Sequence, residues 1–390
     1  LTEGGYLDLP GGNGESARIR ITRVHLEEDT GKLVHPAGAD HSLVDLNRAG
    51  VPLMELVTEP DIRSGAQAKK FCQELQLILR YLGVSDADME KGQMRCEVNI
   101  SLRPEGQEKF GTKVEIKNLN SFRVVEKAID YEIKRQAEVL EEGGKIIQET
   151  RGWNEAKGAT VSQRTKEEAH DYRYFPEPDL PPLKTTKILK DVEALPELPG
   201  EKRVRFKSEY GLPEQDIEVL AYRPELADYF EKVITELDSW AKDAEPKIES
   251  KKLRKLAANY LITELQKLMV QSSSDFEDLR ITPENFAEFV KTVAQGVVSS
   301  SGAQTLLAEM FKTGADPTHI IEDKKLAQVS DESELVQAIS KVVSENSGPV
   351  EEYKKGKAQA LQFLIGKVMA ATKGRANPQA VAEILRKTLQ

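Results

Sequence analysis

The chain has 390 residues, of which 39% are hydrophobic and 31% charged, and its net charge is −10. This length exceeds one ordinary hydrophobic core and predicts two or three domains. No stretch approaches the roughly 18 apolar residues needed to cross a bilayer, so the composition excludes a membrane-spanning protein.

The chain contains two cysteines, Cys72 and Cys96, and no CxxC motif. This pattern argues against a disulfide framework and a zinc–thiolate site, and it favours a reducing, cytoplasmic location. The sequence opens Leu1-Thr2-Glu3, without an initiator methionine or a signal peptide. We therefore expect it to begin partway into a longer protein.

The first part of the chain predicts a β-rich domain with helices packed on it. Residues 17–24 alternate apolar and polar side chains, which is typical of a strand. Ser64 is positioned to cap a helix that ends at Gly83. Residues 95–102 and 113–119 alternate on either side of a turn-rich segment and predict an antiparallel hairpin, after which Ser121 caps a second helix.

The texture of the sequence changes after the proline-rich residues 174–183. Amphipathic helices follow, for example over residues 224–237, 247–270 and 283–296, and strand patterns nearly vanish. A further break near Gly314 isolates a short helical tail. The sequence thus predicts an α+β chain with a β-rich domain (1–198), an all-helical domain (199–314) and a helical tail domain (316–390).

No P-loop, dinucleotide-binding glycine motif, HExxH motif or GxSxG motif is present, so the chemistry must rest on other residues. In the predicted hairpin, alternation places Glu97 and Asn99 on one face of the first strand and Glu115 and Lys117 on one face of the second. Clustered carboxylates beside amides and an ammonium suit a hard cation and a phosphate. An exposed face on which Glu and Lys merely pair across strands remains an alternative interpretation.

Acidic residues also follow the first strands. Glu27 and Glu28 lie in the segment His25-Leu26-Glu27-Glu28-Asp29-Thr30-Gly31-Lys32, which an ordinary polar turn would also explain. Glu55 lies inside an apolar run, where an unpaired carboxylate would cost several kcal/mol. We therefore expect Glu55 to have a cation, an arginine or a metal beside it.

Four segments carry a resemblance to a known family. They are residues 43–64, Arg95-Cys96-Glu97-Val98-Asn99-Ile100-Ser101, Lys117-Asn118-Leu119-Asn120-Ser121 and Asp171-Tyr172-Arg173-Tyr174-Phe175-Pro176-Glu177-Pro178-Asp179. Together they resemble the B subunits of aspartyl/glutamyl-tRNA amidotransferases over essentially the whole chain. The closing region, with Lys373-Gly374-Arg375-Ala376-Asn377-Pro378, is similar to the YqeY-like tail of these proteins.

The resemblance implies that the first domain is a cradle for a kinase and transamidase site. It implies that Mg²⁺ and ATP are the cofactors, that the glutaminase (the A subunit) and the small C subunit of the amidotransferase are partners, and that a mischarged tRNA is the substrate. The family's acidic metal ligands correspond to Glu27, Glu28, Glu55, Glu97 and Glu115, of which Glu55, Glu97 and Glu115 are the predicted catalytic residues. Many relatives have Asp in place of Glu97, and two further ligands, a Glu and a His, are expected before Leu1.

The same resemblance makes Asn99, Lys117, Asn118 and Asn120 candidates for contacts with ATP or phosphate, although the last three are equally plausible as hairpin-end and turn residues. Whether the amino acid is Glu on tRNA(Gln), Asp on tRNA(Asn), or both stays open. A non-catalytic tRNA-binding module and a metal-dependent phosphotransferase acting on a small acid are the competing hypotheses.

The tail is basic on an otherwise acidic chain, with eight Lys or Arg against three Glu from residue 351 onward. We expect an apolar stripe on one side of its helices and a tRNA-binding surface on the other. A solvated helical face would have the same composition. The stripe comprises Leu361, Phe363, Leu364, Val368 and Met369, and the tRNA-binding candidates are Lys354, Lys357, Lys367, Lys373 and Arg375.

Overall fold

The computed structural model describes residues 2–10, 17–165, 181, 184, 186, 195–243, 248–328, 332–372 and 374–389. The chain divides into two compact units, Leu1–Leu198 and Pro199–Gln390. The first combines sheets and helices and the second is helical, which makes the protein α+β as predicted. The family motif at residues 171–179 lies outside the described residues.

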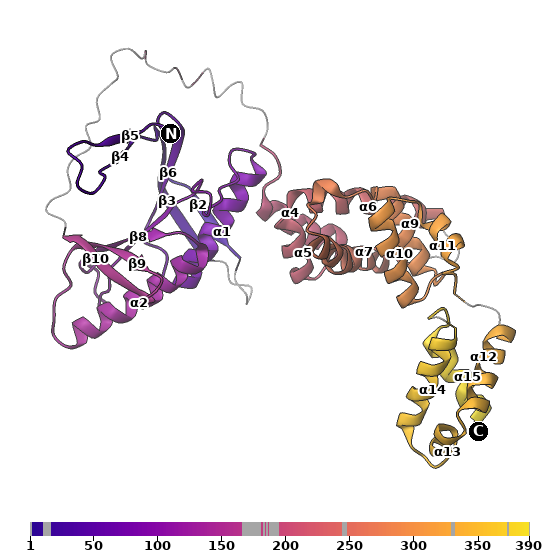
Figure 1. Cartoon of the computed structure of the whole chain (residues 1–390). Helices are drawn as coiled ribbons and strands as arrows, with labels where there is room; N and C mark the ends of the chain where they lie inside the picture. The colour runs from indigo at the N-terminus through magenta and orange to yellow at the C-terminus, as the bar shows by residue number, and fades with distance from the viewer. Residues whose placement is uncertain are drawn as a thin grey trace. The chain divides into compact units, whose positions relative to one another are not determined.

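The first sheet of unit 1 is built around the long strand β3 (Ala17–Glu28), which is the predicted strand with four further residues. Strands β1 (Thr2–Glu3), β2 (Tyr6–Leu9) and β6 (Pro52–Thr58) all pair antiparallel with it. Strands β4 (Lys32–Val34) and β5 (Leu43–Asp45), which come between β3 and β6 in the chain, pair with each other as a separate two-stranded sheet to one side of β6 (Figure 1). The first sheet thus aligns the second half of β3 with β6.

An ion pair fixes the end of β6 against β3. Asp61 accepts hydrogen bonds from the backbone N–H, Nε and NH2 of Arg20, at 2.9, 2.9 and 2.7 Å. These hydrogen bonds, from the side chain first and then the backbone of Arg20, lower the pKa of Asp61 to about 2. Asp61 therefore stays ionised and holds the two strands together at every physiological pH.

The second sheet has the strand order β10-β9-β8-β7. The predicted hairpin forms its antiparallel pair β7 (Cys96–Ile100) and β8 (Val114–Leu119). Strand β9 (Glu149–Asn154) runs parallel to β8, and β10 (Ala159–Thr165) runs antiparallel to β9. A parallel pair needs a crossover connection, which is supplied by helix α2 (Phe122–Glu141).

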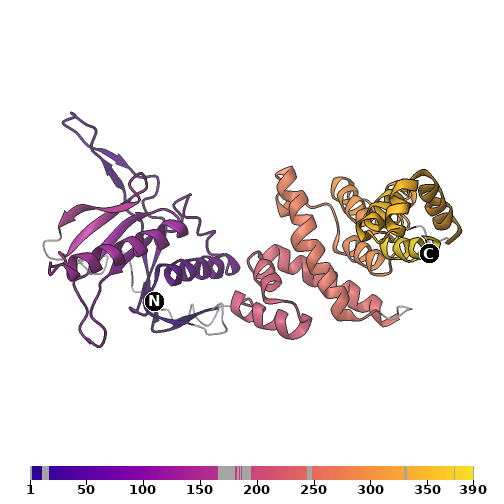
Figure 2. The same ribbon diagram turned by 90° about the horizontal axis from the view of Figure 1, so that it is seen from below.

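Helices α1 (Gly65–Tyr81) and α2 begin at the two predicted caps. The side chains of Ser64 and Ser121 accept from the backbone N–H groups of Gln67 and Val124. Helix α2 runs along one face of the second sheet, as Figure 2 shows, and buries Val125 and Ile129 in a core with Ile116. The opposite face of β7 and β8 is therefore left for polar side chains.

A buried ionic network attaches α2 to β9 and β10. Glu132 is fully buried and accepts from Arg135, Gln136 and Thr160, while Arg151 approaches it to 3.7 Å. Burial acts to raise the pKa of Glu132, but the hydrogen bonds from Arg135, Gln136 and Thr160 outweigh it and the pKa lies below its usual value. The carboxylate is therefore kept charged inside the protein.

Unit 2 is helical over its described residues and contains two separate hydrophobic cores. Helix α4 (Pro199–Arg205) is the first of the unit. The first core is formed by π-helix η1 (Phe206–Tyr210), α5 (Glu214–Ala221), α6 (Pro224–Asp243), α7 (Ser250–Asn259), π-helix η2 (Tyr260–Leu265), α8 (Gln266–Ser272), 3₁₀-helix η3 (Phe276–Asp278), α9 (Pro283–Ala294), α10 (Ser300–Thr313) and α11 (Pro317–Lys324). The second is formed by α12 (Glu332–Glu345), α13 (Ser347–Lys354), α14 (Ala358–Ala371) and α15 (Pro378–Leu389).

The predicted boundary near Gly314 is wrong as the limit between these two cores. Ile320 and Ile321 of α11 are buried in the first core, although we placed residues 316–390 in the tail. Gly314 ends α10 in a left-handed conformation with φ 72°, so the break is a helix cap within one core. The three-domain division otherwise stays a prediction.

Candidate active site

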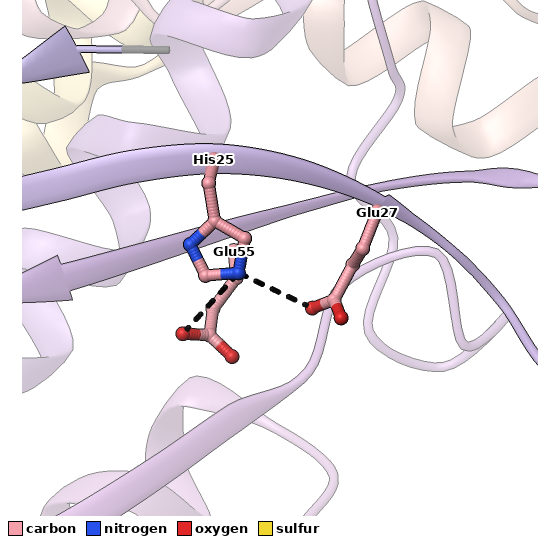
Figure 3. A group of neighbouring side chains, drawn as sticks. All are labelled: His25, Glu27 and Glu55. Atoms are coloured by element: carbon pink, nitrogen blue, oxygen red, sulfur yellow. Dashed lines mark ion pairs between the residues drawn. The ribbon is translucent and has the colours of Figure 1, made fainter. Parts of the chain in front are cut away.

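Three potential metal ligands converge on strands β3 and β6. His25 and Glu55 are register partners on the two antiparallel strands, and Glu27 is two residues further along β3 on the same face. The ligand atoms of His25, Glu27 and Glu55 all lie within 4.8 Å of one another. His25 Nε2 is 3.7 Å from Glu27 Oε1 and 4.0 Å from Glu55 Oε1 (Figure 3).

The donor set of this cluster fits a divalent cation. Two carboxylates and an imidazole supply oxygen and nitrogen ligands, and the side chains of His25, Glu27 and Glu55 are 24%, 43% and 46% exposed. Water therefore has access to complete the coordination shell. Arg23 NH2 contacts Glu55 Oε1 at 3.1 Å and balances part of the negative charge.

The prediction that Glu55 is buried is wrong, although an arginine does lie beside it as expected. Glu55 is half exposed, and so are Leu53 and Met54 on either side of β6. The apolar residues around Glu55 thus lie on an exposed strand. Its carboxylate therefore bears no desolvation cost that would require a partner. Arg23 nevertheless provides the expected arginine.

Glu28 does not join the cluster. Strand alternation turns its side chain to the face of β3 opposite that of His25 and Glu27. Its register partner is Pro52 at the start of β6, three residues away from Glu55. The pairing of β3 with β6 thus brings together Glu27 and Glu55 of the five predicted acids, without Glu28.

The remaining two acids converge on one lysine in the second sheet. Lys117 Nζ lies 3.0 Å from Glu97 Oε1 and 3.7 Å from Glu115 Oε1. Glu97 and Glu115 therefore project from β7 and β8 to the same polar face, as alternation predicts. Glu97 is half exposed, whereas the Glu115 side chain is only 12% exposed. Whether they bind a metal stays a prediction.

The predicted asparagines surround the end of this strand pair. Asn99 on β7 is the register partner of Glu115. Asn118 has a left-handed backbone with φ 62°, which asparagine tolerates and which interrupts the alternation of β8. Asn120 directly precedes the cap of α2. All three side chains are exposed, so a ligand has access to them.

The tail separates its apolar stripe from its cations, with one exception. Leu361, Leu364 and Val368 are buried and Met369 packs against them, but Phe363 is 48% exposed. Our placement of Phe363 on the inner stripe is therefore wrong, because at 100° per residue it points away from the face that Leu364 and Val368 share. Instead, Lys367 Nζ lies 5.3 Å from the centre of its ring.

The tRNA-binding candidates are distributed over the tail helices and their loops. Lys354, Lys357 and Lys367 are exposed, and Arg375 is partly exposed. Lys357 pairs with Glu352 at 2.9 Å. Lys373 lies outside the described residues. The part of the chain that the structure describes contains no helix that is long and apolar enough to cross a membrane.

Two further residues of the candidate site, His25 and Thr150, are not among those predicted from the sequence. His25 alternates with Glu27 and Glu55 lies across from it, but the pairing of β3 with β6 cannot be deduced from either strand alone. Thr150 lies on β9, and its hydroxyl donates to Glu115 Oε2 at 2.6 Å. The alternation of His25 with Glu27 was a usable signal, whereas nothing in residues 149–154 distinguishes Thr150.

Comparisons with known proteins identify two matching families. The GatB/GatE catalytic domain matches residues 1–191, and the GatB domain of the YqeY type matches residues 244–389. Three relatives share 48–49% sequence identity with the chain.

Each of these relatives is named as the B subunit of an aspartyl/glutamyl-tRNA(Asn/Gln) amidotransferase. The protein of Thermoanaerobacter sp. (strain X514) is 48% identical and that of Caldanaerobacter subterraneus subsp. tengcongensis 49% identical, each over 100% of this chain and 79% of the relative. The protein of Herpetosiphon aurantiacus is 48% identical over 99% of this chain and 78% of the relative. The chain therefore belongs to the GatB family of amidotransferase B subunits.

Proposed function

We propose that this protein is the B subunit of an ATP-dependent tRNA amidotransferase. It would amidate Glu on mischarged tRNA(Gln), Asp on mischarged tRNA(Asn), or both, and act in the cytoplasm. The family membership over the whole chain carries this proposal. The acidic and amide side chains of unit 1 supply the chemistry that such a reaction needs.

The reaction requires that a side-chain carboxylate be activated. In the first step a carboxylate oxygen of the tRNA-bound amino acid attacks the γ-phosphorus of ATP, which releases ADP and forms an acyl phosphate. Ammonia then attacks the acyl carbon, phosphate leaves, and the amide forms after loss of a proton. Phosphoryl transfer of this kind depends mainly on positioning and charge stabilisation, with no need for a protein nucleophile.

The polar side chains take complementary roles in this scheme. Lys117, paired with Glu97 and Glu115, is a donor for a phosphate oxygen, and its exposed neighbours Asn99, Asn118 and Asn120 offer amide groups to the nucleotide or the acyl phosphate. Glu55, Glu97 and Glu115 are the proposed catalytic carboxylates, and Glu27, Glu28, Glu55, Glu97 and Glu115 the proposed metal-binding set. His25 is added to that set because it lies beside Glu27 and Glu55.

Mg²⁺ is the cation proposed for these ligands, and when bound it would neutralise negative charge on phosphate oxygens. The His25 imidazole, which softer cations such as Mn²⁺ or Zn²⁺ accept more readily, makes the identity of the cation worth measuring. Glu28 would have to act away from the His25 cluster, because it lies on the other face of β3.

Ammonia is proposed to come from glutamine hydrolysed by the amidase, the A subunit of the assembly, which the small C subunit would complete. The tail is proposed to hold the tRNA through Lys354, Lys357, Lys367, Lys373 and Arg375. Exposed cations contact phosphates without reading sequence, which suits a surface that positions the acceptor end for the cradle.

ATP cleavage by the assembled enzyme tests the proposal. The protein, combined with its amidase and its small partner, is supplied in turn with Glu-tRNA(Gln), Asp-tRNA(Asn) and the same tRNAs without amino acid. We expect ADP formation to require a mischarged tRNA and to precede amide formation. Equal ATP cleavage with a free dicarboxylic acid would favour a small-acid phosphotransferase, and tRNA binding with no ATP cleavage would favour a non-catalytic binding module.

A further inference from the structure

Thr150 contacts Glu115 from the neighbouring parallel strand. The two residues are register partners on β8 and β9, and Thr150 Oγ1 donates to Glu115 Oε2 at 2.6 Å. Thr150 is 2% exposed, so this hydroxyl is withdrawn from water. A buried hydroxyl with a carboxylate partner makes a short, charge-assisted hydrogen bond, which is stronger than one between neutral groups.

Strand β9 is itself held from the opposite face of the sheet. Arg151 contacts Glu149 at 2.5 Å and donates to Thr160 Oγ1 at 2.8 Å, and it approaches the buried Glu132 of α2. These contacts fix the backbone on either side of Thr150. The position of its hydroxyl therefore follows from the packing of α2 rather than from a flexible side chain.

The next residue on the Thr150 face, Gly152, leaves room for further polar groups. A Cβ atom at this position would lie 2.2 Å from Gln163 Nε2 and 3.0 Å from Asn118 Nδ2. A side chain at this position would displace the Gln163 amide from its place and crowd that of Asn118. Thr150 and Gly152 thus extend the polar face of β7 and β8 onto the third strand.

We propose that Thr150 is a positioning residue for the Glu115 carboxylate in the amidotransferase reaction. By engaging Oε2, the hydroxyl fixes the rotation of the carboxylate and leaves Oε1 on the side of Lys117. Residues that orient a ligand or catalytic group from behind commonly contribute ten- to hundredfold in metal affinity or activity. This inference rests on the proposed function, because it assigns Thr150 a role through Glu115.

The test compares three variants in the complete assembly. Thr150→Val keeps the shape and strand preference of threonine but removes the hydroxyl, whereas Thr150→Ser keeps the hydroxyl. Thr318→Val is the matched control, because the Thr318 hydroxyl also donates to a carboxylate, that of Glu288 at 2.6 Å, but lies in unit 2 outside the contacts that hold β9. Two quantities are measured: the kcat and KM of tRNA-dependent ATP cleavage, and the affinity for Mn²⁺ followed by electron paramagnetic resonance.

We expect Thr150→Val to lower kcat by about tenfold and to weaken Mn²⁺ binding by a similar factor, with the KM for tRNA unchanged. Thr150→Ser should restore both quantities, and Thr318→Val should change neither. Unaltered Mn²⁺ affinity in Thr150→Val, failure of serine to restore it, or an equal loss in Thr318→Val would overturn the inference. If the wild-type assembly itself showed no tRNA-dependent ATP cleavage, the proposed function would fail instead.

Discussion

A single ammonium between two carboxylates defines the electrostatics of the site on the second sheet. Lys117 lies within ion-pair distance of both Glu97 and Glu115, and one ammonium can offset the formal charge of only one carboxylate. Such a group attracts a cation yet still presents a donor to a phosphate oxygen. The less exposed Glu115 is the member whose charge water screens least.

Glu115→Gln should therefore abolish phosphoryl transfer selectively. We expect tRNA-dependent ATP cleavage to fall by about 100-fold or more, since a preorganised charge in a catalytic site is typically worth that much. Glutaminase activity of the amidase partner, measured in the same assembly, should remain. Glu105→Gln, in the exposed loop between β7 and β8, serves as the control. Equal loss of both activities would indicate collapse of the assembly rather than a lost catalytic group.

Single residues also mark the limits of prediction from the sequence. The same-face placement of Glu97 and Glu115 followed from alternation within two short strands, which is a local property. The exposure of Glu55 and Phe363 could not be predicted in the same way. The apolar residues around them do not reveal which other element, if any, covers that strand or helix. Exposure is decided by packing partners that are distant in the sequence.

At the scale of elements, the sequence predicts the helices and strands that carry a local pattern, such as a cap or an apolar–polar alternation. It does not predict elements that lack one. The N-cap residues Ser64 and Ser121 predict the starts of α1 and α2, and the alternation of apolar and polar side chains predicts the hairpin β7–β8. Strand β9 reads Glu-Thr-Arg-Gly-Trp-Asn, which has no apolar alternation to reveal it. It exists because α2 returns the chain parallel to β8 and Glu132 attaches the helix to β9 and β10.

The buried carboxylate of Glu132 should be the point on α2 most sensitive to a change of charge. Glu132→Gln removes the buried carboxylate that pairs with Arg135, whereas Arg151 keeps Glu149 as a partner. Breaking a buried pair of this kind typically costs about 3 kcal/mol or more. We expect the urea midpoint of unit 1 to fall accordingly. Glu138→Gln on the same helix is the control, because its pair with Lys134 is 3.9 Å long and exposed, and it should change stability by less than about 0.5 kcal/mol.

A small effect of Glu132→Gln, similar to that of Glu138→Gln, would contradict this account. It would mean that the apolar contacts of α2 with Ile116 hold the helix in place without the ionic network. In that case the position of Thr150 would also depend less on the network than we infer.

At the scale of the molecule, the boundary of the tail determines how its function can be tested. Deleting residues 316–390 would remove Ile320 and Ile321 from the first helical core and confuse loss of folding with loss of binding. Deletion of residues 332–390 leaves that core whole and removes α12 to α15. The truncation therefore has to begin at α12.

We expect this shorter deletion to weaken tRNA binding, raise the KM for tRNA and leave Mn²⁺ binding unchanged. Each lost phosphate contact should reduce the slope of log affinity against log salt by roughly one unit. Labelled tRNA is titrated against the complete and truncated assemblies at two salt concentrations, with Lys312→Gln in α10 as a control for an exposed lysine outside the tail. Unchanged affinity and slope would show that the tail lysines serve only solubility.

The unfolding of two of the separate cores can be followed by the fluorescence of the protein's own tryptophans. The chain has two tryptophans. Trp153 on β9 packs against the core of unit 1 and Trp240 on α6 against the first core of unit 2. Replacing one of them with phenylalanine leaves an indole whose emission follows the unfolding of unit 1 alone or of the first helical core alone. The four tail helices contain no tryptophan, so tryptophan fluorescence does not report their unfolding. A tryptophan would have to be introduced into one of these helices to follow it.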